Sequence, residues 1–345
     1  MGGTANLKTL HAAGYHAPDA YTVERQMIFA REWLLLGHAR ELQSPGDYLA
    51  EAIAGWPVLV IRDKAGALKG FHNVCRHRAG PLVEDGCGHT AALRCRYHGW
   101  LYDTDGRLAR RPDFSAGADA FDGRELALKP IAVAEWRGFV FVNLDVDAGP
   151  LTDGLGDLVT TTRDFPIERY SFYRRQTYDL SVNWKTYVDN YLEGYHIPLM
   201  HKGLARDLDM ASYRVENADR VSIHRSSMRS EAAYQGLFLW RWPNNTIGVY
   251  GGGFNICRIL PEGVRRTRLT FDFYFDPQAG LDADAKERAA STTCGIVEED
   301  FPMCEVVQRN LEAGSYDCGP LSPKHEQGVA YFHDLVRHAT GGRVT

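Results

Sequence analysis

The chain has 345 residues, of which 44% are hydrophobic and 24% are charged. At about 150 residues per domain, this length predicts two domains that each bury a core. The composition is that of a globular protein and excludes a disordered, collagen-like or coiled-coil chain. Lys and Arg number 39 against 44 Asp and Glu, which gives a net charge of −5. We therefore expect no nucleic acid and no membrane as partner, since no apolar run approaches the roughly 20 residues that span a bilayer.

Seven cysteines are present, an odd and sparse number that does not predict a disulfide framework. The first residues lack the charged start and the apolar core of a secretory signal. We therefore expect a cytoplasmic protein with reduced thiols, in which a close group of Cys and His residues indicates a metal site rather than a crosslink. Cys87 and His89, in the segment EDGCGH, have no partner at ligand spacing and predict a turn.

The first part of the chain predicts a helix and then short strands. Residues 21–35 place apolar side chains at helical spacing, and Gly37 is a suitable helix end. From residue 46 onward, β-rich runs alternate with turns that contain Gly and Asp, which predicts a small antiparallel β domain over residues 40–148. Its predicted strands include residues 56–62, 68–75, 99–102 and 137–144.

The remaining chain predicts a mixed region over residues 149–345. Residues 182–192 predict a helix, and five later runs predict strands of one larger antiparallel sheet. Because strands and helices come in blocks, the pattern favours an α+β fold over a doubly wound sheet. We expect the helical segment 1–39 to pack on this second domain. The five predicted strands are residues 222–230, 237–242, 246–250, 255–260 and 266–275, and the later predicted helices are residues 282–311 and 324–338.

Two Cys–His pairs lie inside the predicted β domain. Cys75 and His77 form one pair, Cys95 and His98 form the other, and a glycine follows each pair. Two thiolates and two neutral imidazoles are the ligands of a Rieske [2Fe–2S] centre, in which the thiolates hold one iron and the imidazoles hold the other. A structural zinc site is the alternative. Zinc fingers, however, group their ligands as Cys-x2–4-Cys and His-x3–5-His, unlike these mixed pairs.

A second group of potential ligands follows about 100 residues later. His196 and His201 end the segment NWKTYVDNYLEGYHIPLMH. Pro198 disfavours helix at the residue before it, so the chain bends there and can turn His201 back toward His196. Two histidines and one carboxylate form the facial triad of non-haem Fe(II) oxygenases, which leaves positions open for O2 and substrate. By spacing, the carboxylate can come from any of three neighbours, Glu298, Glu299 and Asp300.

At these motifs the sequence resembles the oxygenase components of the Rieske non-haem iron oxygenases. The segments CRHRAGPL and CRYHGWLYD carry the resemblance, which extends over roughly residues 37–333. It implies a Rieske domain over residues 40–148 and a helix-grip-like catalytic domain over residues 149–345. It also implies a [2Fe–2S] cluster held by the two Cys–His pairs and a mononuclear Fe(II) held by two histidines and one carboxylate. The cluster ligands are then Cys75, His77, Cys95 and His98, and the iron ligands are His196, His201 and Asp300.

The resemblance also gives a role to Glu193, three residues before His196. In the family, an acidic residue at this position bridges a Rieske histidine to an iron histidine, usually across a subunit boundary. Most relatives have Asp there, and Glu is also found in relatives that act on quaternary amines, such as the carnitine oxygenases. A carboxylate that accepts hydrogen bonds from imidazole groups on both sides would fix their tautomers. An exposed glutamate on a helix is the alternative.

The resemblance implies the terminal oxygenase of a system that uses O2 and forms homotrimers. We expect electrons from a separate reductase or ferredoxin, because the chain has neither a GxGxxG fingerprint in a βαβ unit nor a plant-type ferredoxin cysteine run. The expected reaction is hydroxylation or oxidative demethylation of a small organic substrate, as in the choline, betaine and carnitine oxygenases. The alternatives are an oxygenase that mono- or dihydroxylates an aromatic acid, a Rieske electron carrier, and a zinc-stabilised binding module.

Aromatic residues suggest where the substrate binds. Residues 237–250 resemble sheet strands that face an iron pocket. Four nearby aromatic side chains can form a cage for an ammonium cation, and packing in the core of the sheet is the alternative. These side chains are Trp240, Trp242, Tyr250 and Phe254.

Overall fold

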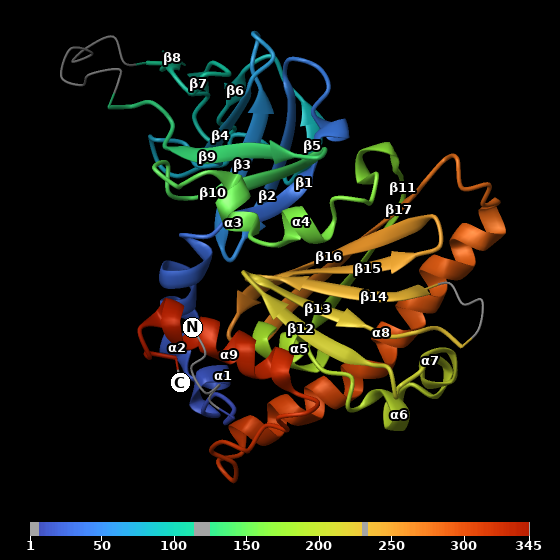
Figure 1. Ribbon diagram of the computed structural model, residues 1–345. Helices are drawn as coiled ribbons and strands as arrows, with labels where there is room; N and C mark the ends of the chain where they lie inside the picture. Colours follow the sequence, from blue (N-terminus) through green and yellow to red (C-terminus); the bar gives the residue numbers. More distant parts are fainter. Residues whose placement is uncertain (1–6, 114–124, 230–233, 345) are drawn as a thin grey trace. The chain divides into compact units, whose positions relative to one another are not determined.

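The structure is a computed structural model that describes residues 7–113, 125–229 and 234–344 (Figure 1). The chain divides into two compact units. One unit is Phe29–Leu151, and the other combines Met1–Ile28 with Thr152–Thr345. Both are built on antiparallel sheets, so the predicted α+β fold is confirmed. Within the described ranges, no helix is long and apolar enough to cross a membrane.

The unit Phe29–Leu151 holds a seven-stranded sheet and a three-stranded sheet. The larger sheet has the order β1-β10-β9-β4-β3-β2-β5, and the smaller has the order β6-β7-β8. Apolar side chains of both sheets and two cysteines, Cys75 and Cys95, share one core. The strands are β1 (Leu34–His38), β2 (Asp47–Ile53), β3 (Trp56–Arg62), β4 (Leu68–His72), β5 (Gly86–His89), β6 (Leu93–Arg94), β7 (Leu101–Tyr102), β8 (Leu108–Arg110), β9 (Pro130–Trp136) and β10 (Phe139–Asn143).

The predicted helix over residues 21–35 is wrong in its second half. Helix α2 (Pro18–Glu24) runs into a short π-helix, Arg25–Phe29, and the chain then enters strand β1. Leu34 of β1 pairs with Val142 of β10, and Gly37, expected to end the helix, lies within the strand. Pairing with a distant strand overrides the local helical spacing, because sheet formation depends on neighbours that the local sequence does not show.

The second unit holds a seven-stranded sheet with the order β11-β17-β16-β15-β14-β13-β12. Helices α5 (Trp184–Tyr191), α8 (Ala283–Glu312) and α9 (Gln327–Thr340) pack on one another or against this sheet (Figure 1). The strands are β11 (Ser171–Leu180), β12 (Arg214–Ala218), β13 (Val221–Arg225), β14 (Tyr234–Arg241), β15 (Asn245–Tyr250), β16 (Gly253–Gly263) and β17 (Arg266–Phe275), and the short helices are α1 (Ala13–His16), α3 (Leu151–Leu155), α4 (Leu158–Thr161), α6 (Ile197–Met200) and α7 (Lys202–Asp207).

Most elements of this unit confirm the sequence predictions. The expected helices 182–192, 282–311 and 324–338 correspond to α5, α8 and α9, and all five expected strands are present. The run 222–230 is shorter than expected, because β13 ends at Arg225, and residue 230 lies outside the described residues. Strands β11 and β12 were not predicted, since both alternate charged and polar side chains with few apolar ones.

The segment NWK fixes the start of helix α5. The side chain of Asn183 caps the helix by accepting a hydrogen bond from the backbone N–H of Lys185 at 3.0 Å. Trp184 donates from Nε1 to Glu24 Oε2 at 2.8 Å, and the Lys185 ammonium binds the other carboxylate oxygen of Glu24. Burial lowers the pKa of Lys185, and the charge of Glu24 opposes this shift. Both charged side chains are fully buried, so each depends on the other for compensation.

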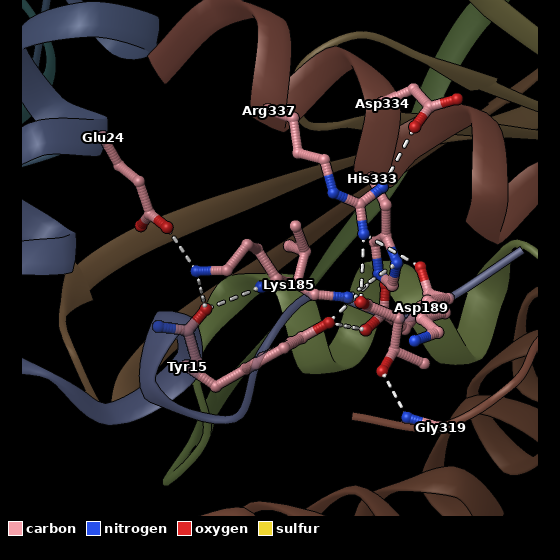
Figure 2. Close-up of polar contacts among 12 residues, drawn as sticks. Tyr15, Glu24, Lys185, Asp189, Gly319, His333, Asp334 and Arg337 are labelled. Atoms are coloured by element: carbon pink, nitrogen blue, oxygen red, sulfur yellow. Dashed lines mark hydrogen bonds and ion pairs between the residues drawn. The ribbon is translucent and has the colours of Figure 1, made fainter. Parts of the chain in front are cut away.

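A second polar cluster holds the other end of α5 (Figure 2). The carboxylate of Asp189 accepts a hydrogen bond from the Tyr15 hydroxyl at 2.5 Å and contacts His333 Nε2 at 2.8 Å. The backbone N–H of Leu10 donates to His333 Nδ1 at 3.2 Å, so Nε2 carries the imidazole proton and donates it to Asp189. Helix α5 is therefore tied to the N-terminal segment and to α9 at the same place.

We expect Glu24→Gln to lower the free energy of unfolding by about 3–5 kcal/mol, because it leaves the buried Lys185 ammonium without a counter-charge. Urea unfolding monitored by tryptophan fluorescence measures the change. The matched control is Asp179→Asn, which breaks the exposed pair Asp179–Arg268 (3.0 Å) and should cost at most about 1 kcal/mol. Equal losses in the two variants would contradict the role of the buried pair.

Candidate functional site

The two predicted cluster loops have the same backbone geometry. In the first, Cys75 donates its N–H to Gly80 at 2.8 Å, and in the second, Cys95 donates to Trp100 at 2.9 Å. A Cβ atom at Gly80 would lie 2.9 Å from Cys95 Sγ, so the glycine lets the two loops approach each other. Both thiols are buried. The structure therefore brings together the two cysteines that are 20 positions apart in the sequence.

The two predicted cluster histidines lie next to each other on the outer side of these loops. The ring centroids of His77 and His98 are 4.6 Å apart, and His77 stacks on the buried ring of Trp100 at 4.8 Å with an interplanar angle of 4°. His98 is exposed and His77 is half-buried. Desolvation, His98 and Arg78 lower the pKa of His77, which favours the neutral imidazole that binds metal.

This donor set fits a Rieske cluster. Burial raises the pKa of the Cys95 thiol, and the hydrogen bond with Cys75 raises it further, so a thiolate pair here needs a cationic centre beside it. Tyr102 reaches Cys75 Sγ with its hydroxyl at 3.3 Å, and the same hydroxyl accepts from the backbone N–H of Arg76 at 3.0 Å. Hydrogen bonds to the sulfur ligands are one way in which proteins tune cluster potentials. Tyr102 was not singled out in the sequence.

Three predicted iron ligands converge in the second unit. His196, His201 and Asp300 each offer one ligand atom, and these atoms lie within 4.8 Å of one another. The two Nε2 atoms are 3.2 Å apart, and Asp300 Oδ1 lies 2.8 Å from His201 Nε2 and 3.7 Å from His196 Nε2. Asp300 Oδ1 is buried and forms no hydrogen bond within the part of the chain that the structure describes. Two histidines and one carboxylate on one face fit a mononuclear Fe(II) centre.

The electrostatics of this group favour a cation. Burial alone lowers the pKa of His201, but Asp300 and Glu299 together raise it above its usual value. Carboxylates that stabilise an imidazolium also stabilise a metal ion in its place. His201 is buried, whereas His196 is partly exposed.

The structure distinguishes the three carboxylates that sequence spacing alone left as candidates for the metal site. Asp300, on α8, lies among the histidines, and Glu299 Oε2 lies 2.7 Å from His201 Nδ1 on the far side of that ring. Glu298 instead accepts a hydrogen bond from the hydroxyl of Tyr178 at 2.7 Å. One turn of α8 thus offers a carboxylate that could bind a metal (Asp300), one that contacts the ring of His201 (Glu299) and one that points to Tyr178 (Glu298).

Glu193 lies against the other iron-site histidine. Its Oε1 is 2.5 Å from His196 Nδ1, and its Oε2 accepts from the backbone N–H of His196 at 3.1 Å and from that of Tyr195. These contacts hold Nδ1 of His196 as a donor and leave Nε2 for a metal. Asp189 does not contact the iron-site histidines and is not simply solvated, since it holds Tyr15 and His333.

A cavity of about 100 Å³ lies beside the three convergent residues. An apolar cavity of about 150 Å³ holds benzene, so this one suits a small organic molecule. Of the two alternatives for the aromatic run, packing in the core is confirmed and the cage is wrong, because all four residues are buried and none lines this cavity. The ring of Trp240, for example, packs against the rings of Trp242 and Phe332. The hydroxyl groups of Tyr250 and Thr293 form a hydrogen bond with each other. The aromatic residues that line the cavity are Tyr187, Tyr191, Tyr213, Phe238 and Phe271.

Four other residues correct or extend what the sequence predicted. Cys87 and His89 lie in strand β5 and not in the predicted turn, and within the described residues neither belongs to a group of potential metal ligands. His89 instead contacts Asp47 at 2.9 Å. His224, which lines the cavity, was missed, because alternation along its strand places it with Ser222 on the face opposite Val221 and Ile223, and both faces of this strand are buried. Tyr213, also in the lining, belongs to no predicted element and carried no signal.

Two family models match the chain. Residues 32–131 match the Rieske [2Fe-2S] domain, and residues 167–342 match the catalytic domain of the ring hydroxylating alpha subunit. The chloroplastic choline monooxygenase of Arabidopsis thaliana is 30% identical over 344 residues, which cover 94% of this chain and 81% of that protein. The carnitine monooxygenase oxygenase subunit of Escherichia coli (strain K12) is 27% identical over 349 residues, which cover 95% of this chain and 92% of that one.

Solved structures agree with these matches. The quaternary ammonium Rieske monooxygenase CntA superposes with a TM-score of 0.87 at 27% identity, over 96% of this chain and 95% of that one, and its structure is described as giving insights into carnitine oxidation and inter-subunit electron transfer. Naphthalene 1,2-dioxygenase from Rhodococcus sp. superposes with a TM-score of 0.78 at 19% identity, over 97% and 95% of the two chains. The second likeness supports the shared fold alone.

We expect Asp300→Ala to lower the iron content from about three atoms per chain to about two, because the mononuclear iron loses its only carboxylate ligand while the [2Fe–2S] cluster is untouched. Metal analysis and the visible spectrum of the cluster check this. The matched control is Glu298→Ala, two residues before Asp300 on the same helix. This variant should keep about three iron atoms per chain. An Asp300→Ala protein with full iron would refute the assignment.

Proposed function

Because this chain belongs to the Rieske ring-hydroxylating oxygenase family, it is the terminal oxygenase component of a Rieske non-haem iron system, and we propose that its substrate is a quaternary amine. The observation that carries the proposal is the small aromatic-lined cavity beside the group His196, His201 and Asp300. Aromatic faces attract quaternary ammonium groups through their quadrupoles. Relatives named for choline and carnitine oxidation, aligned over more than nine-tenths of the chain, support the same substrate class.

We propose that the two metal groups are held by the residues described above. The cluster takes the two buried thiols and the two outer imidazoles, and the mononuclear Fe(II) takes two imidazoles and one carboxylate. When bound, the cluster would supply stored electrons and the Fe(II) would supply the reactivity toward O2 that oxidation of a C–H bond requires. The proposed ligands are Cys75, His77, Cys95 and His98 for the cluster, and His196, His201 and Asp300 for the iron.

The overall reaction consumes one O2, two electrons and two protons and yields one oxidised substrate and one water. The protein's own residues bind the substrate in the cavity, and separate electron-transfer partners supply the electrons. We propose a reductase or ferredoxin as that partner. The aromatic lining orients the ammonium group so that one of its neighbouring C–H bonds faces the iron-site residues. Loss of formaldehyde from a hydroxylated N-methyl group would make the reaction a demethylation.

We propose that Glu193 bridges the two metal sites across a subunit boundary. The carboxylate already contacts His196 Nδ1, and its side chain is only 14% exposed. Around it, apolar side chains of the same unit are unusually exposed, including Tyr195 (58%), Leu199 (82%) and Met303 (45%). Exposed apolar patches mark protein interfaces, and this one supports a homotrimer in which a neighbouring Rieske domain covers the surface.

We also propose the functional division that the sequence suggested. Residues 40–148 would carry the cluster, residues 149–345 the catalytic iron, and, of the predicted supporting segment 1–39, the part before Phe29 would support the catalytic domain, since the rest belongs to the other unit. The buried bonds from Tyr15 and Glu24 to helix α5 are consistent with that supporting role. Seven free cysteines fit a reducing compartment, and we propose the cytoplasm.

The substrate proposal is tested by O2 uptake with the reconstituted enzyme and an electron donor, across a panel of quaternary amines and aromatic acids. We expect uptake coupled to product only with quaternary amines. Product mass and formaldehyde release then separate hydroxylation from demethylation. Coupled oxidation of an aromatic acid, with none of an amine, would replace our proposal by a ring oxygenase.

We expect Glu193→Gln to keep about three iron atoms per chain and an unchanged cluster spectrum, yet to slow substrate-dependent reoxidation of the reduced cluster by about 10–100-fold. The neutral amide keeps the shape of the side chain but weakens its hold on the imidazole N–H groups. Rapid-mixing absorbance measurements of the cluster report the rate. Glu298→Gln serves as the matched control, and normal reoxidation in Glu193→Gln would exclude the bridging role.

A further inference from the structure

A chain of hydrogen bonds leads from helix α9 to the cavity. It begins at the backbone carbonyl of Gln327, which can only accept, and receives a hydrogen bond from Asn217 Nδ2 at 3.0 Å. This bond fixes the orientation of the Asn217 amide and directs its Oδ1 toward Ser222. Ser222 Oγ donates its single proton to that oxygen at 2.8 Å.

The order of donor and acceptor in this series of hydrogen bonds is also determined at His224. Because the proton of Ser222 is already engaged, its oxygen accepts from His224 Nε2 at 3.1 Å. Burial lowers the pKa of His224 to about 3, so the ring is neutral and carries one N–H. With that proton on Nε2, the Nδ1 atom must accept, and it lies 2.8 Å from the hydroxyl of Tyr213.

The series of hydrogen bonds therefore ends at the phenol of Tyr213, whose proton is engaged by His224 Nδ1. Tyr213 and His224 both line the cavity beside His196. The ring of Tyr213 packs on the backbone of Gly194, where a Cβ atom would lie 2.5 Å from Cζ, so the ring has a fixed position next to the iron-site loop. Burial raises the pKa of Tyr213, and Glu193 raises it further, which keeps the hydroxyl protonated. Toward a ligand, its oxygen can only accept.

We propose that Tyr213 is a specificity-determining residue that selects an ammonium substrate carrying a hydroxyl group, by accepting a hydrogen bond from that hydroxyl. The inference rests on the proposed function and goes beyond it, because a quaternary nitrogen has no N–H and only a hydroxyl can satisfy this acceptor. A site built to bond a substrate hydroxyl discriminates against an analogue that lacks it, since its own polar atom is then left unpaired.

The test compares choline with ethyltrimethylammonium, which differs by the absence of one oxygen. Binding to the iron-loaded enzyme is measured by calorimetry without an electron donor, so that no turnover occurs. The wild-type protein should bind choline about tenfold more tightly. Tyr213→Phe should remove this preference by weakening choline alone, and its iron content and cluster spectrum should stay normal.

Ser222→Ala provides a second variant that does not touch the cavity. Without Ser222, His224 can carry its proton on Nδ1 and donate it to Tyr213, which frees the phenol proton to point inward. The preference for choline should therefore fall, although the lining is unchanged. Tyr178→Phe is the matched control, because this hydroxyl donates to Glu298 outside the cavity, and it should keep the wild-type preference.

The outcomes separate the two proposals. Equal wild-type affinities for the two ligands, or an equal loss of both in Tyr213→Phe, overturn the role of Tyr213 and leave the quaternary-amine function standing. Failure of both ligands to bind the wild-type protein overturns this inference, whereas the proposed substrate class falls only if no quaternary amine supports coupled O2 uptake. A preference that survives in Ser222→Ala but disappears in Tyr213→Phe overturns the proton direction assigned here.

Discussion

The position of helix α5 relative to helix α8 is the constraint on which the iron site depends. Gln308 of α8 accepts, through Oε1, from the backbone N–H of Asn183 at 3.0 Å and from Thr186 Oγ1 at 3.0 Å, and so holds the first turn of α5. Asp300 lies on the same helix as Gln308, about 12 Å away along its axis. His196 follows the other end of α5. A shift between the two helices would therefore separate the carboxylate from the histidines.

The buried polar groups around α5 make this arrangement rigid. Glu24 and Lys185 are both inaccessible to water, and a buried pair loses its compensation if either partner moves. Asp189 is held from two directions, by Tyr15 and by His333 (Figure 2). Such networks fix one geometry better than apolar packing does, because hydrogen bonds depend on direction as well as distance. The N-terminal segment, which contributes no predicted ligand, is thus part of what shapes the site.

The sequence was informative where chemistry requires particular residue types at short spacing. The Cys–His pairs and the segment that contains His196 and His201 could be identified because their ligands are close neighbours in the chain. The choice of Asp300 over Glu298 depends on the rotation of α8, which only the fold determines. The aromatic cage failed for a related reason, because an aromatic run in a strand alternates between two faces and the sequence does not say which face is the core.

The three histidines that line the cavity, His196, His201 and His224, share one physical device. In each imidazole one nitrogen is engaged by a partner, and this determines what the other nitrogen can do. Glu193 and Glu299 bind Nδ1 of the iron-site histidines and leave Nε2 for the metal, whereas Ser222 binds Nε2 of His224 and leaves Nδ1 as an acceptor. At one wall of the cavity, control of the tautomer prepares His196 and His201 to bind a metal. At another wall, the same control at His224 prepares the Tyr213 oxygen to accept a hydrogen bond from the substrate. In the proposed function, metal binding and substrate recognition would both depend on proton positions that Glu193, Glu299 and Ser222 determine.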